Sequence, residues 1–305
     1  MCTSKLLLLT AILSCGLFAP AQKNAVSNLP GTFSKAGTLQ SESESGSTEN
    51  SEMVFLRPAV SKSDTGSRWE LGISLGASHY FGDLNNRFLN GSAISWMFGL
   101  KARYWLNDHV SLSGQLSKLN LRGSDASDKT GNLSPRGLSF TTQVYDLNLL
   151  CQYNLPLFRV GYASDLVKMG VATGVSAYYF NPRGKYQGKW YNLRELGTEG
   201  QTINGSPYPK FSFGIPMAVT LRYPLSSNLN LEGFLSFEFC FTDYFDDVSD
   251  GPYPDPAQLR AANGSNGDAA VYLSDPTGLG KTRPVRGAPQ KDDYSNFGIS
   301  LMYAF

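Results

Sequence analysis

Hydrophobic and polar residues alternate along the end of the chain, over residues 294–305. Phe297, Ile299, Leu301, Tyr303 and Phe305 fall on one face of this segment, and small or polar residues fall on the other. A period of two is typical of a β-strand with one apolar face. The same alternation recurs earlier, so the sequence predicts strands over residues 69–81, 93–106, 109–122, 138–153, 166–180, 210–223, 229–242 and 294–305.

The third of these segments changes phase along its length. Val110, Leu112 and Leu116 share one face, whereas Leu119 and Leu121 fall on the other. A β-bulge inserts one extra residue into a strand and shifts the faces in this way. We therefore expect a bulge within residues 109–122.

The connections between the predicted strands alternate between short and long. Those at 107–108, 154–165 and 224–228 are short, and the others are longer. An even number of strands with short periplasmic turns and long outer loops is the bacterial outer-membrane pattern. The sequence thus predicts an all-β fold, an eight-stranded antiparallel transmembrane outer-membrane β-barrel over residues 68–305, with the N- and C-termini in the periplasm.

The competing fold is a soluble, lipocalin-like barrel, in which the apolar face points inward and the polar face outward. The polar faces of this chain carry mainly Gly and Ser with few charges, as in 69–81. A water-exposed exterior usually carries many Lys and Glu residues. The membrane barrel is therefore the favoured interpretation.

Aromatic residues collect near the ends of the predicted strands, as expected for rings at the two membrane interfaces. At the periplasmic rim we expect Trp69, Tyr104, Trp105, Tyr153, Tyr223, Tyr303 and Phe305, and at the outer rim Tyr80, Phe81, Phe140, Tyr178, Tyr179, Phe211, Tyr244 and Tyr294.

Several charged residues point into the barrel by the same alternation. An eight-stranded barrel has an interior that side chains fill, so opposite charges should pair there and leave no water-filled pore. The predicted lumen charge network consists of Glu70, Lys101, Arg103, Asp146, Arg222, Glu232 and Glu238.

The N-terminus has the features of a signal peptide. Lys5 precedes an apolar run from Leu6 to Phe18, and an A-x-A site ends at Ala21, which predicts a signal peptide over residues 1–21. In the alternative interpretation, Cys15 is lipidated. Residues 22–67 are rich in Ser and Glu without a sustained period, so we expect a disordered periplasmic segment there.

Composition excludes several classes of function. The net charge of +1 gives no large field for nucleic acid. Cys2 and Cys15 lie in the predicted signal peptide, and the other two cysteines, Cys151 and Cys240, are too few for a disulfide framework. The histidines, His79 and His109, are expected at opposite ends of the barrel, where neither completes a Ser-His-Asp site. We therefore expect no enzyme activity, no catalytic residues and no cofactor.

An acidic cluster begins the last outer loop. Its residues are Asp243, Asp246, Asp247 and Asp250. Carboxylate oxygens are ligands that Ca²⁺ prefers. A solvated acidic loop is the alternative, and it is the one that we favour.

Three parts of the sequence together resemble a known family. They are residues 75–85, residues 179–182 with 190–201, and residues 241–249. The resemblance is to the PorG-type outer-membrane proteins of Bacteroidota, associated with the type IX secretion system, and it extends from about residue 69 to 305. The motif residues are Gly82, Asp83, Asn181, Pro182, Trp190, Gly197, Thr198, Glu199, Gly200, Gln201, Thr242, Asp243, Tyr244, Asp246 and Asp247.

The resemblance implies a function. It implies a non-enzymatic barrel that anchors the periplasmic ring of the secretion system to the outer membrane, with outer-membrane lipid and periplasmic ring lipoproteins as partners. Because the motifs lie mostly in predicted outer loops, they either shape that end of the barrel or contact another membrane partner. Two alternatives remain: an accessory subunit of another outer-membrane complex, such as the barrel-assembly machinery, and a barrel enzyme or small-ligand binder.

Overall fold

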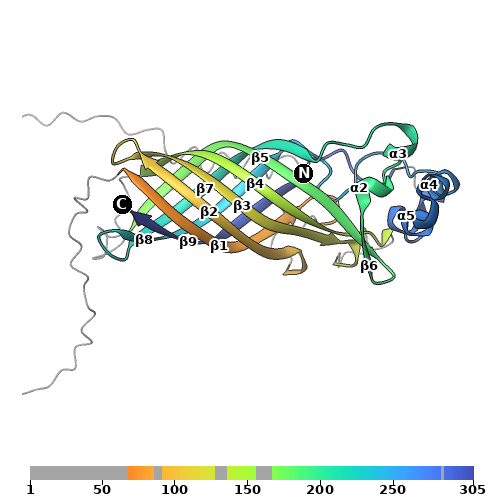
Figure 1. Ribbon diagram of the computed structural model, residues 1–305, viewed down its shortest axis with the longest axis horizontal. Helices are drawn as coiled ribbons and strands as arrows, with labels where there is room; N and C mark the ends of the chain where they lie inside the picture. Colours follow the sequence, from red (N-terminus) through yellow and green to blue (C-terminus); the bar gives the residue numbers. More distant parts are fainter. Residues whose placement is uncertain (1–67, 86–90, 128–135, 156–166, 283–284) are drawn as a thin grey trace, which may run out of the picture. The chain divides into compact units, whose positions relative to one another are not determined.

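A computed structural model describes residues 68–85, 91–127, 136–155, 167–282 and 285–305 (Figure 1). The predicted signal peptide at 1–21, the alternative of lipidation at Cys15 and the predicted disordered segment at 22–67 lie outside the described residues. Most of the predicted turn at 154–165 also lies outside them.

The strands follow the segments that the alternation predicts. They are β1 (Trp69–Phe81), β2 (Ile94–Trp105), β3 (Val110–Ser124), β4 (Ser139–Leu155), β5 (Lys168–Tyr186), β6 (Lys189–Asn192), β7 (Phe211–Pro224), β8 (Leu229–Cys240) and β9 (Asp293–Ala304). Each predicted segment agrees with a strand to within a few residues, except that β5 extends to Tyr186 and forms a hairpin with the short β6.

All strands except β6 form a closed antiparallel ring. The order is β4-β3-β2-β1-β9-β8-β7-β5, and β4 pairs with β5 to close it. The last strand pairs with the first over a long register, from Glu70 opposite Ala304 to Phe81 opposite Asp293. Figure 1 shows the strands tilted along the barrel, as closure requires. The predicted eight-stranded barrel is confirmed.

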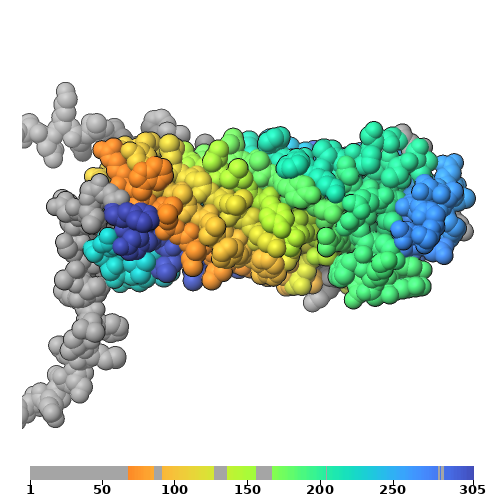
Figure 2. Space-filling view, viewed as in Figure 1, coloured from red at the N-terminus to blue at the C-terminus, as the bar shows by residue number. Residues whose placement is uncertain are grey.

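The outer wall of the barrel is apolar. Leu71, Ile73 and Leu75 on β1 are each about half exposed, and the equivalent positions of the other strands carry Leu, Val, Ile and Phe. Figure 2 shows this wall between the last residues of the chain and the helices at the other end. Because only an apolar solvent favours such a surface, the chain is a membrane-spanning β-barrel, and the soluble alternative is wrong.

The bulge expected in 109–122 is absent. β3 pairs continuously with β2 and with β4, from Val110 opposite Tyr153 to Ser124 opposite Ser139. Leu119 and Leu121 are fully buried because they point into the barrel. The prediction failed because it assumed a lumen that is polar along its whole length, whereas apolar side chains fill the lumen near one end.

The expected outer aromatic rim is also partly wrong. Tyr80, Tyr178 and Tyr294 are fully buried, Phe140 is 5% exposed, and Tyr244 is half-buried in the same core. By the alternation of their strands, Tyr80, Phe140, Tyr178 and Tyr294 face the lumen, and Tyr244 packs against them from the last long connection. Tyr179 and Phe211 do face outward, and at the other rim Trp69, Tyr153, Tyr303 and Phe305 are exposed as expected.

Long connections cover one end of the barrel. They contain α2 (Leu193–Leu196), α3 (Gln201–Asn204), α4 (Pro256–Asn263) and α5 (Gly267–Ser274), with 3-10 turns η1 (Gly91–Ala93), η2 (Asp125–Ser127), η5 (Gly264–Asn266) and η6 (Leu279–Lys281). We call this the loop end, and the opposite end, where the C-terminus lies, the turn end (Figure 1). None of the described helices combines the length and apolar character needed to cross a membrane.

Candidate functional site

Charged side chains occupy the lumen near the turn end. Glu232 accepts from Lys101 Nζ at 2.8 Å and pairs with Arg103 Nη2 at 2.7 Å. Glu70 pairs with Arg103 Nη1 at 3.5 Å and with both terminal nitrogens of Arg222. We call these five residues the lumen ion network.

Strand register explains how the lumen ion network assembles. Glu70 lies opposite Arg103 on β1 and β2, and Arg222 lies opposite Glu232 on β7 and β8. All five side chains are nearly or fully buried. A buried charge is costly unless it is paired, so this arrangement ties both sides of the barrel together across its lumen.

The other two charged residues predicted in the lumen bind differently. Asp146 accepts hydrogen bonds from Tyr294 at 3.0 Å and from Asn148 at 2.8 Å. Glu238 accepts from Ser176 at 3.0 Å and from Tyr178 at 3.2 Å. Neither forms an ion pair with a cation among the described residues. They therefore belong to a hydroxyl and amide network above the lumen ion network.

The loop end is closed by a cap that the loops build. We define the cap as residues 82–85, 125–127, 136–138, 187–209, 241–282 and 285–292. Its apolar part, which includes Leu196, Phe245, Leu259 and Leu273, joins the buried Leu and Tyr side chains of the upper lumen in one core. The cap is therefore packed onto the barrel.

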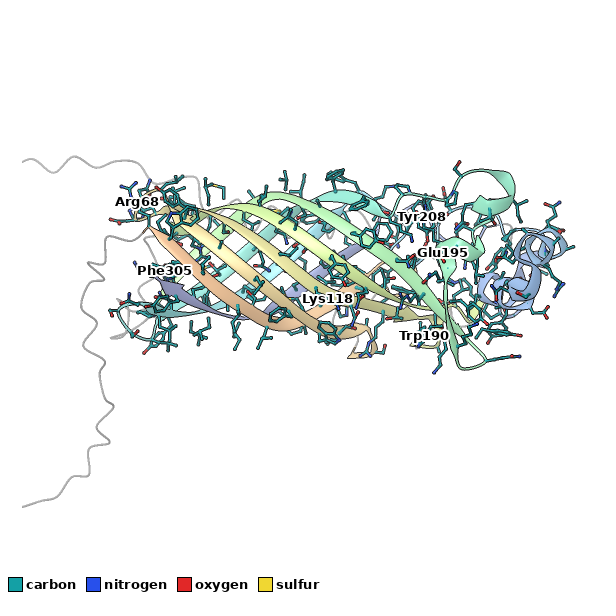
Figure 3. The ribbon with its side chains drawn as sticks, viewed as in Figure 1. Arg68, Lys118, Trp190, Glu195, Tyr208 and Phe305 are labelled. Carbon is teal, nitrogen blue, oxygen red and sulfur yellow. The ribbon has the colours of Figure 1, made fainter. Side chains whose placement is uncertain are left out.

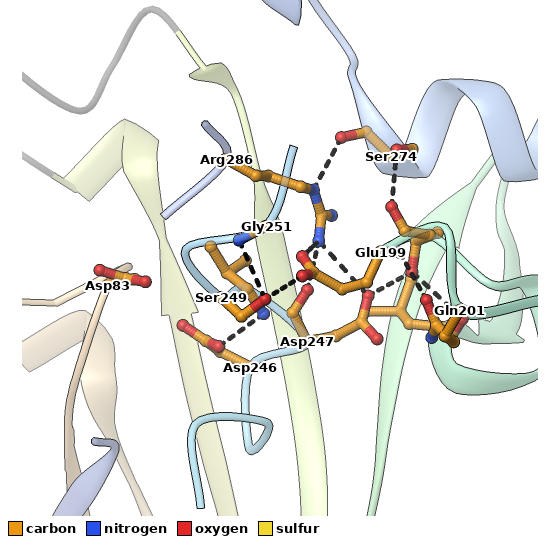
Figure 4. A network of polar contacts seen from close by, with 12 residues as sticks. Asp83, Glu199, Gln201, Asp246, Asp247, Ser249, Gly251, Ser274 and Arg286 are labelled. Carbon is orange, nitrogen blue, oxygen red and sulfur yellow. Dashed lines mark hydrogen bonds and ion pairs between the residues drawn. The ribbon is translucent and has the colours of Figure 1, made fainter. Parts of the chain in front are cut away.

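Arg286 is the centre of the polar contacts in the cap (Figure 4). Its Nε donates to Ser274 O at 3.0 Å, and its Nη1 donates to Glu199 and to the carbonyl of Asp247. The Asp247 carboxylate in turn accepts from Thr198 and, at 2.6 Å, from Tyr208. One buried guanidinium thus joins three segments of the cap.

Arg136 makes a second junction. It forms a bidentate pair with Asp125 and donates to the carbonyl oxygens of Asp83 at 2.8 Å and Arg286 at 3.0 Å. The Asp83 carboxylate accepts from Ala288 N. Bidentate, charge-assisted hydrogen bonds of this kind fix geometry as well as adding stability.

Two carboxyl groups share one tyrosine beneath the cap. The Tyr80 hydroxyl lies 2.5 Å from Asp246 Oδ2 and 2.7 Å from Asp292 Oδ1. A hydroxyl has one proton to donate, so the second short contact requires a proton on one of the two carboxyl groups. Burial and the neighbouring charge raise the pKa of Asp246 and of Asp292 well above the usual range.

Other cap carboxyl groups are shifted in the same direction. Burial raises the pKa of Asp83 to about 6 and that of Asp247 to about 7, although Arg286 opposes the shift at Asp247. Burial, assisted by the charge of Asp83, raises the pKa of Asp243 to about 8. The cap thus holds more carboxyl groups than its guanidinium groups neutralise.

Two of the four proposed calcium ligands are used in other contacts. Asp246 binds Tyr80 and Val248 N, Asp247 binds Thr198 and Tyr208, and Asp250 is exposed. No three His, Cys, Asp or Glu residues in the described part of the chain are grouped to hold a metal ion. The geometry therefore gives the calcium hypothesis no support. The favoured alternative of a solvated acidic loop is wrong, because Asp243, Asp246 and Asp247 are buried in the packed cap.

The family-motif residues are mostly brought together in the cap. Asp83, Thr198, Glu199 and Asp247 join its polar contacts, and Tyr244 stacks on Tyr208 at 4.2 Å. The remaining motif residues shape the chain around them. Gly197 and Gly200 have positive φ beside α2 and α3, Gly82 pairs with Asn85, Gln201 binds Glu199 N, and Thr242 accepts from Asp292 N.

Three motif residues lie apart from those contacts. Asn181 and Pro182 belong to β5, not to a loop, and Trp190 is exposed on β6. The histidines lie at opposite ends, His79 near the loop end of β1 and His109 in the turn before β3. The two remaining cysteines are free, with Cys151 on the outer wall and Cys240 buried.

Sequence reasoning missed several residues of the cap. Arg136, Tyr208, Arg286 and Asp292 lie in segments without period, so no pattern marked them. Arg286 and Arg136 are separated by 150 positions and meet only through loop packing. The available signal was chemical: a loop rich in carboxylates needs cations when it is buried.

Comparison with known proteins gives a family and several structural likenesses. The chain is similar to Neisserial surface protein A (11% identity, 78% of this chain and 98% of that chain, TM-score 0.37) and to Ail, the attachment invasion locus protein of Yersinia pestis (10%, 78% and 99%, 0.36). It is also similar to a major outer membrane protein from Thermus thermophilus (14%, 78% and 99%, 0.36). No curated protein matches it.

A family model described as Domain of unknown function (DUF6089) matches residues 52–274. The match spans more than half of the chain and takes in most of the barrel and the cap. The chain therefore belongs to the DUF6089 family.

Proposed function

We propose that this protein is a non-enzymatic outer-membrane component of the type IX secretion system that anchors the periplasmic ring to the outer membrane. In this proposal the turn end and the N- and C-termini of the chain face the periplasm, and the loop end faces outward. The division into short turns and long loops supports this orientation, because it is the bacterial pattern.

The observation that carries the proposal is the contrast between the two ends. The loop end is covered by its packed cap, whereas the turn end has only short connections among the described residues, and two of these turns each present an exposed leucine. Leu106 is 45% exposed and Leu225 is 41% exposed, each at the start of its turn. Exposed apolar residues in a turn are suited to a contact with another protein.

The two turns also have the same rigid local structure. Leu106 N donates to Val110 O at 3.0 Å, and Leu225 N donates to Leu229 O at 2.8 Å. A side-chain oxygen closes each turn: Asn107 accepts from Val110 N, and Ser226 accepts from Leu229 N. Rigid turns lose little conformational entropy when a partner binds them.

The filled lumen supports an anchoring role. Side chains of the lumen ion network and of the packed cap fill the interior along the barrel. A filled barrel suits a structural anchor better than a channel. The resemblance to PorG-type proteins supports the type IX secretion system as the complex that is anchored. Because most motif residues hold the cap, the contact with the ring is assigned to the opposite end.

Co-purification tests the proposal. The protein is tagged in an outer loop, the membrane is solubilised gently, and associated proteins are identified. We expect periplasmic ring lipoproteins of the type IX system, and we expect Leu106→Ser/Leu225→Ser to lose them while the loop-end variant Val285→Ser retains them. Recovery of the barrel-assembly machinery instead, or of this protein alone, would overturn the proposal.

A further inference from the structure

The outward side chains of β3, β4 and β5 change character in successive rows toward the loop end. The register places Lys118, Tyr145, Tyr179 and Phe211 side by side on β3, β4, β5 and β7. The rings of Tyr145 and Tyr179 lie 6.4 Å apart, and Lys118 Nζ lies 5.6 Å from the Tyr145 ring. An aromatic row of this kind marks a membrane interface.

The next two rows are polar. Two residues further along each strand, Asn120, Gln143 and Asn181 form a row of amides. Two residues beyond those, Arg122, Thr141 and Arg183 form a row with two guanidinium groups. The β5–β6 hairpin adds Lys185 opposite Trp190. We call these rows, from the amides to Lys185 and Trp190, the polar ladder.

No cation of the polar ladder forms an ion pair with a residue that the structure describes. Arg122 donates to Ile94 O at 2.5 Å, Arg183 donates to Asn192 Oδ1 at 3.1 Å, and Lys185 lies 5.8 Å from the Trp190 ring. None of the three forms an ion pair with another described residue, whereas every cation of the lumen ion network does. Within the described part of the chain, this face therefore carries positive charge without a paired carboxylate.

The polar ladder occupies one sector of the barrel. On the other side, apolar outward residues extend toward the loop end, as in Ala77 between Trp96 and Phe297, and in Phe241 after β8. The next row there pairs His79 with Ser295, both of which are buried, and neither of them is Lys or Arg. Figure 3 shows Lys118 on the wall and Trp190 on the hairpin toward the loop end, with Arg68 and Phe305 at the other end. A general interfacial belt would surround the barrel, so the ladder is a local surface.

The height of the polar ladder above the aromatic row limits which lipids can contact it. Two residues of a tilted strand rise about 5 Å along the membrane normal, so the ladder extends about 15 Å above the aromatic row. A phospholipid headgroup layer is only about 5–8 Å thick. A lipid that reaches the whole ladder must carry a larger headgroup, with acceptors for amides and negative charge for guanidinium groups.

We propose that the polar ladder binds a phosphorylated glycolipid of the outer leaflet, with Arg122, Arg183 and Lys185 on its phosphates and the amide row on its sugar hydroxyls. Trp190 then lies against the sugar. The assignment to the outer leaflet rests on the proposed orientation of the barrel and is independent of the secretion partner.

Binding to purified lipid tests the chemistry. The full mature chain in detergent is titrated with bisphosphorylated lipid A, with the same lipid after removal of its phosphates, and with phosphatidylglycerol, and complexes are quantified by native mass spectrometry. We compare Arg183→Gln/Lys185→Gln with Arg260→Gln/Lys291→Gln, which removes the same charge from exposed cap residues away from the ladder.

The expected result is tighter binding of phosphorylated lipid A than of either other lipid, by at least about tenfold. The ladder variant should weaken it about thirtyfold, at roughly one kcal/mol per cation, and the cap variant less than about twofold. Equal binding by the ladder variant and the unmodified protein would overturn the proposal, as would equal affinity for phosphatidylglycerol or for the dephosphorylated lipid.

Orientation is measured separately. A cysteine introduced at the exposed Gln258 is labelled in intact cells with an impermeant reagent. Labelling supports the assignment to the outer leaflet. Absence of labelling would overturn the orientation, and the assignment with it, while leaving the measured lipid affinity to stand alone.

Discussion

The lumen ion network and the cap use buried charge in opposite ways. In the lumen ion network, Glu70 and Glu232 are each shared between cations, and every member is a strand residue whose side chain points into the lumen. In the cap, carboxyl groups outnumber guanidinium groups, and the loops that carry them have no register. Buried charges that are all paired and held by strands give a rigid plug, whereas an excess of carboxyl groups held by loops gives a cover whose stability depends on protonation.

The largest effect is expected from breaking the lumen ion network. Glu232→Gln leaves Lys101 and Arg103 buried beside a neutral amide. Removing one partner of a buried ion pair costs about 3–5 kcal/mol. We expect a loss of this size in the free energy of unfolding by urea in lipid vesicles.

The matched control is a carboxylate outside the barrel. Glu195→Gln breaks the pair with Lys210 at 3.4 Å, in which the Glu195 side chain is about half exposed. Such surface changes stay within about 0.5 kcal/mol. Equal losses in the two variants would contradict the importance of the lumen ion network.

Breaking the cap should have a smaller and local effect. Arg286→Gln removes the guanidinium that joins Glu199, Ser274 and Asp247. We expect protease cleavage within residues 241–292 to accelerate at least about tenfold, because segments that have lost buried contacts open locally. The free energy of unfolding of the barrel should not change.

Arg260→Gln is the control for the cap, since its pair with Asp268 is exposed on both sides. It should leave the cleavage rate unchanged. If Arg286→Gln instead unfolds the barrel together with the cap, the two regions are one cooperative unit and the comparison fails.

The acid excess predicts a pH dependence of the cap. The folded pKa values of Asp83, Asp247 and Asp243, about 6, 7 and 8, lie above the unfolded value of about 3.9. The folded cap thus binds more protons than the open one, and its stability falls as pH rises. We expect protease protection that is complete near pH 4 and declines between about pH 5 and 8.

The barrel provides the internal reference for the pH experiment. Its heat-induced shift in electrophoretic mobility should stay constant over the range in which cap protection declines. Protection that increases with pH would show that the cap carboxylates are stabilised as anions, contrary to the account.

The smallest expected effect is on conductance. The protein in planar bilayers should show no steady large conductance, and Arg286→Gln should not either, because opening the cap leaves the lumen ion network in place. A steady large conductance in the unmodified protein would refute a filled lumen. Conductance that appears only with Arg286→Gln would assign closure to the cap alone.

The same contrast explains what the sequence could predict. Alternation of side chains placed the strands, and parity alone placed Glu70, Arg103, Arg222 and Glu232 in the lumen, because a strand has only two faces. Parity also assigned Leu119 correctly to the face opposite Leu116, but the assumption of a polar lumen turned this into a bulge. The barrel wall can be predicted from the sequence because one constraint, the alternation of side chains between two faces, governs every strand.

The contacts of the cap cannot be predicted from the sequence, because loops have no such alternation. Tyr80 belongs to β1 and faces the lumen by parity, yet its partners Asp246 and Asp292 come from the last long connection. The resemblance found the motif residues Thr198, Glu199 and Asp247 without their partner Arg286. Their contacts depend on how separate loops pack, which local pattern does not encode.

The most direct test of the central claim, that the turn end anchors the ring, is site-specific crosslinking in cells at both ends. A photoreactive residue is placed at Asp108 or Ser227 in the turns, and at Lys189 or Gln258 at the loop end, all of which are exposed. The account predicts crosslinks to a periplasmic ring lipoprotein from Asp108 and Ser227 only. Crosslinks to the ring from Lys189 or Gln258, or from none of the four, would contradict it.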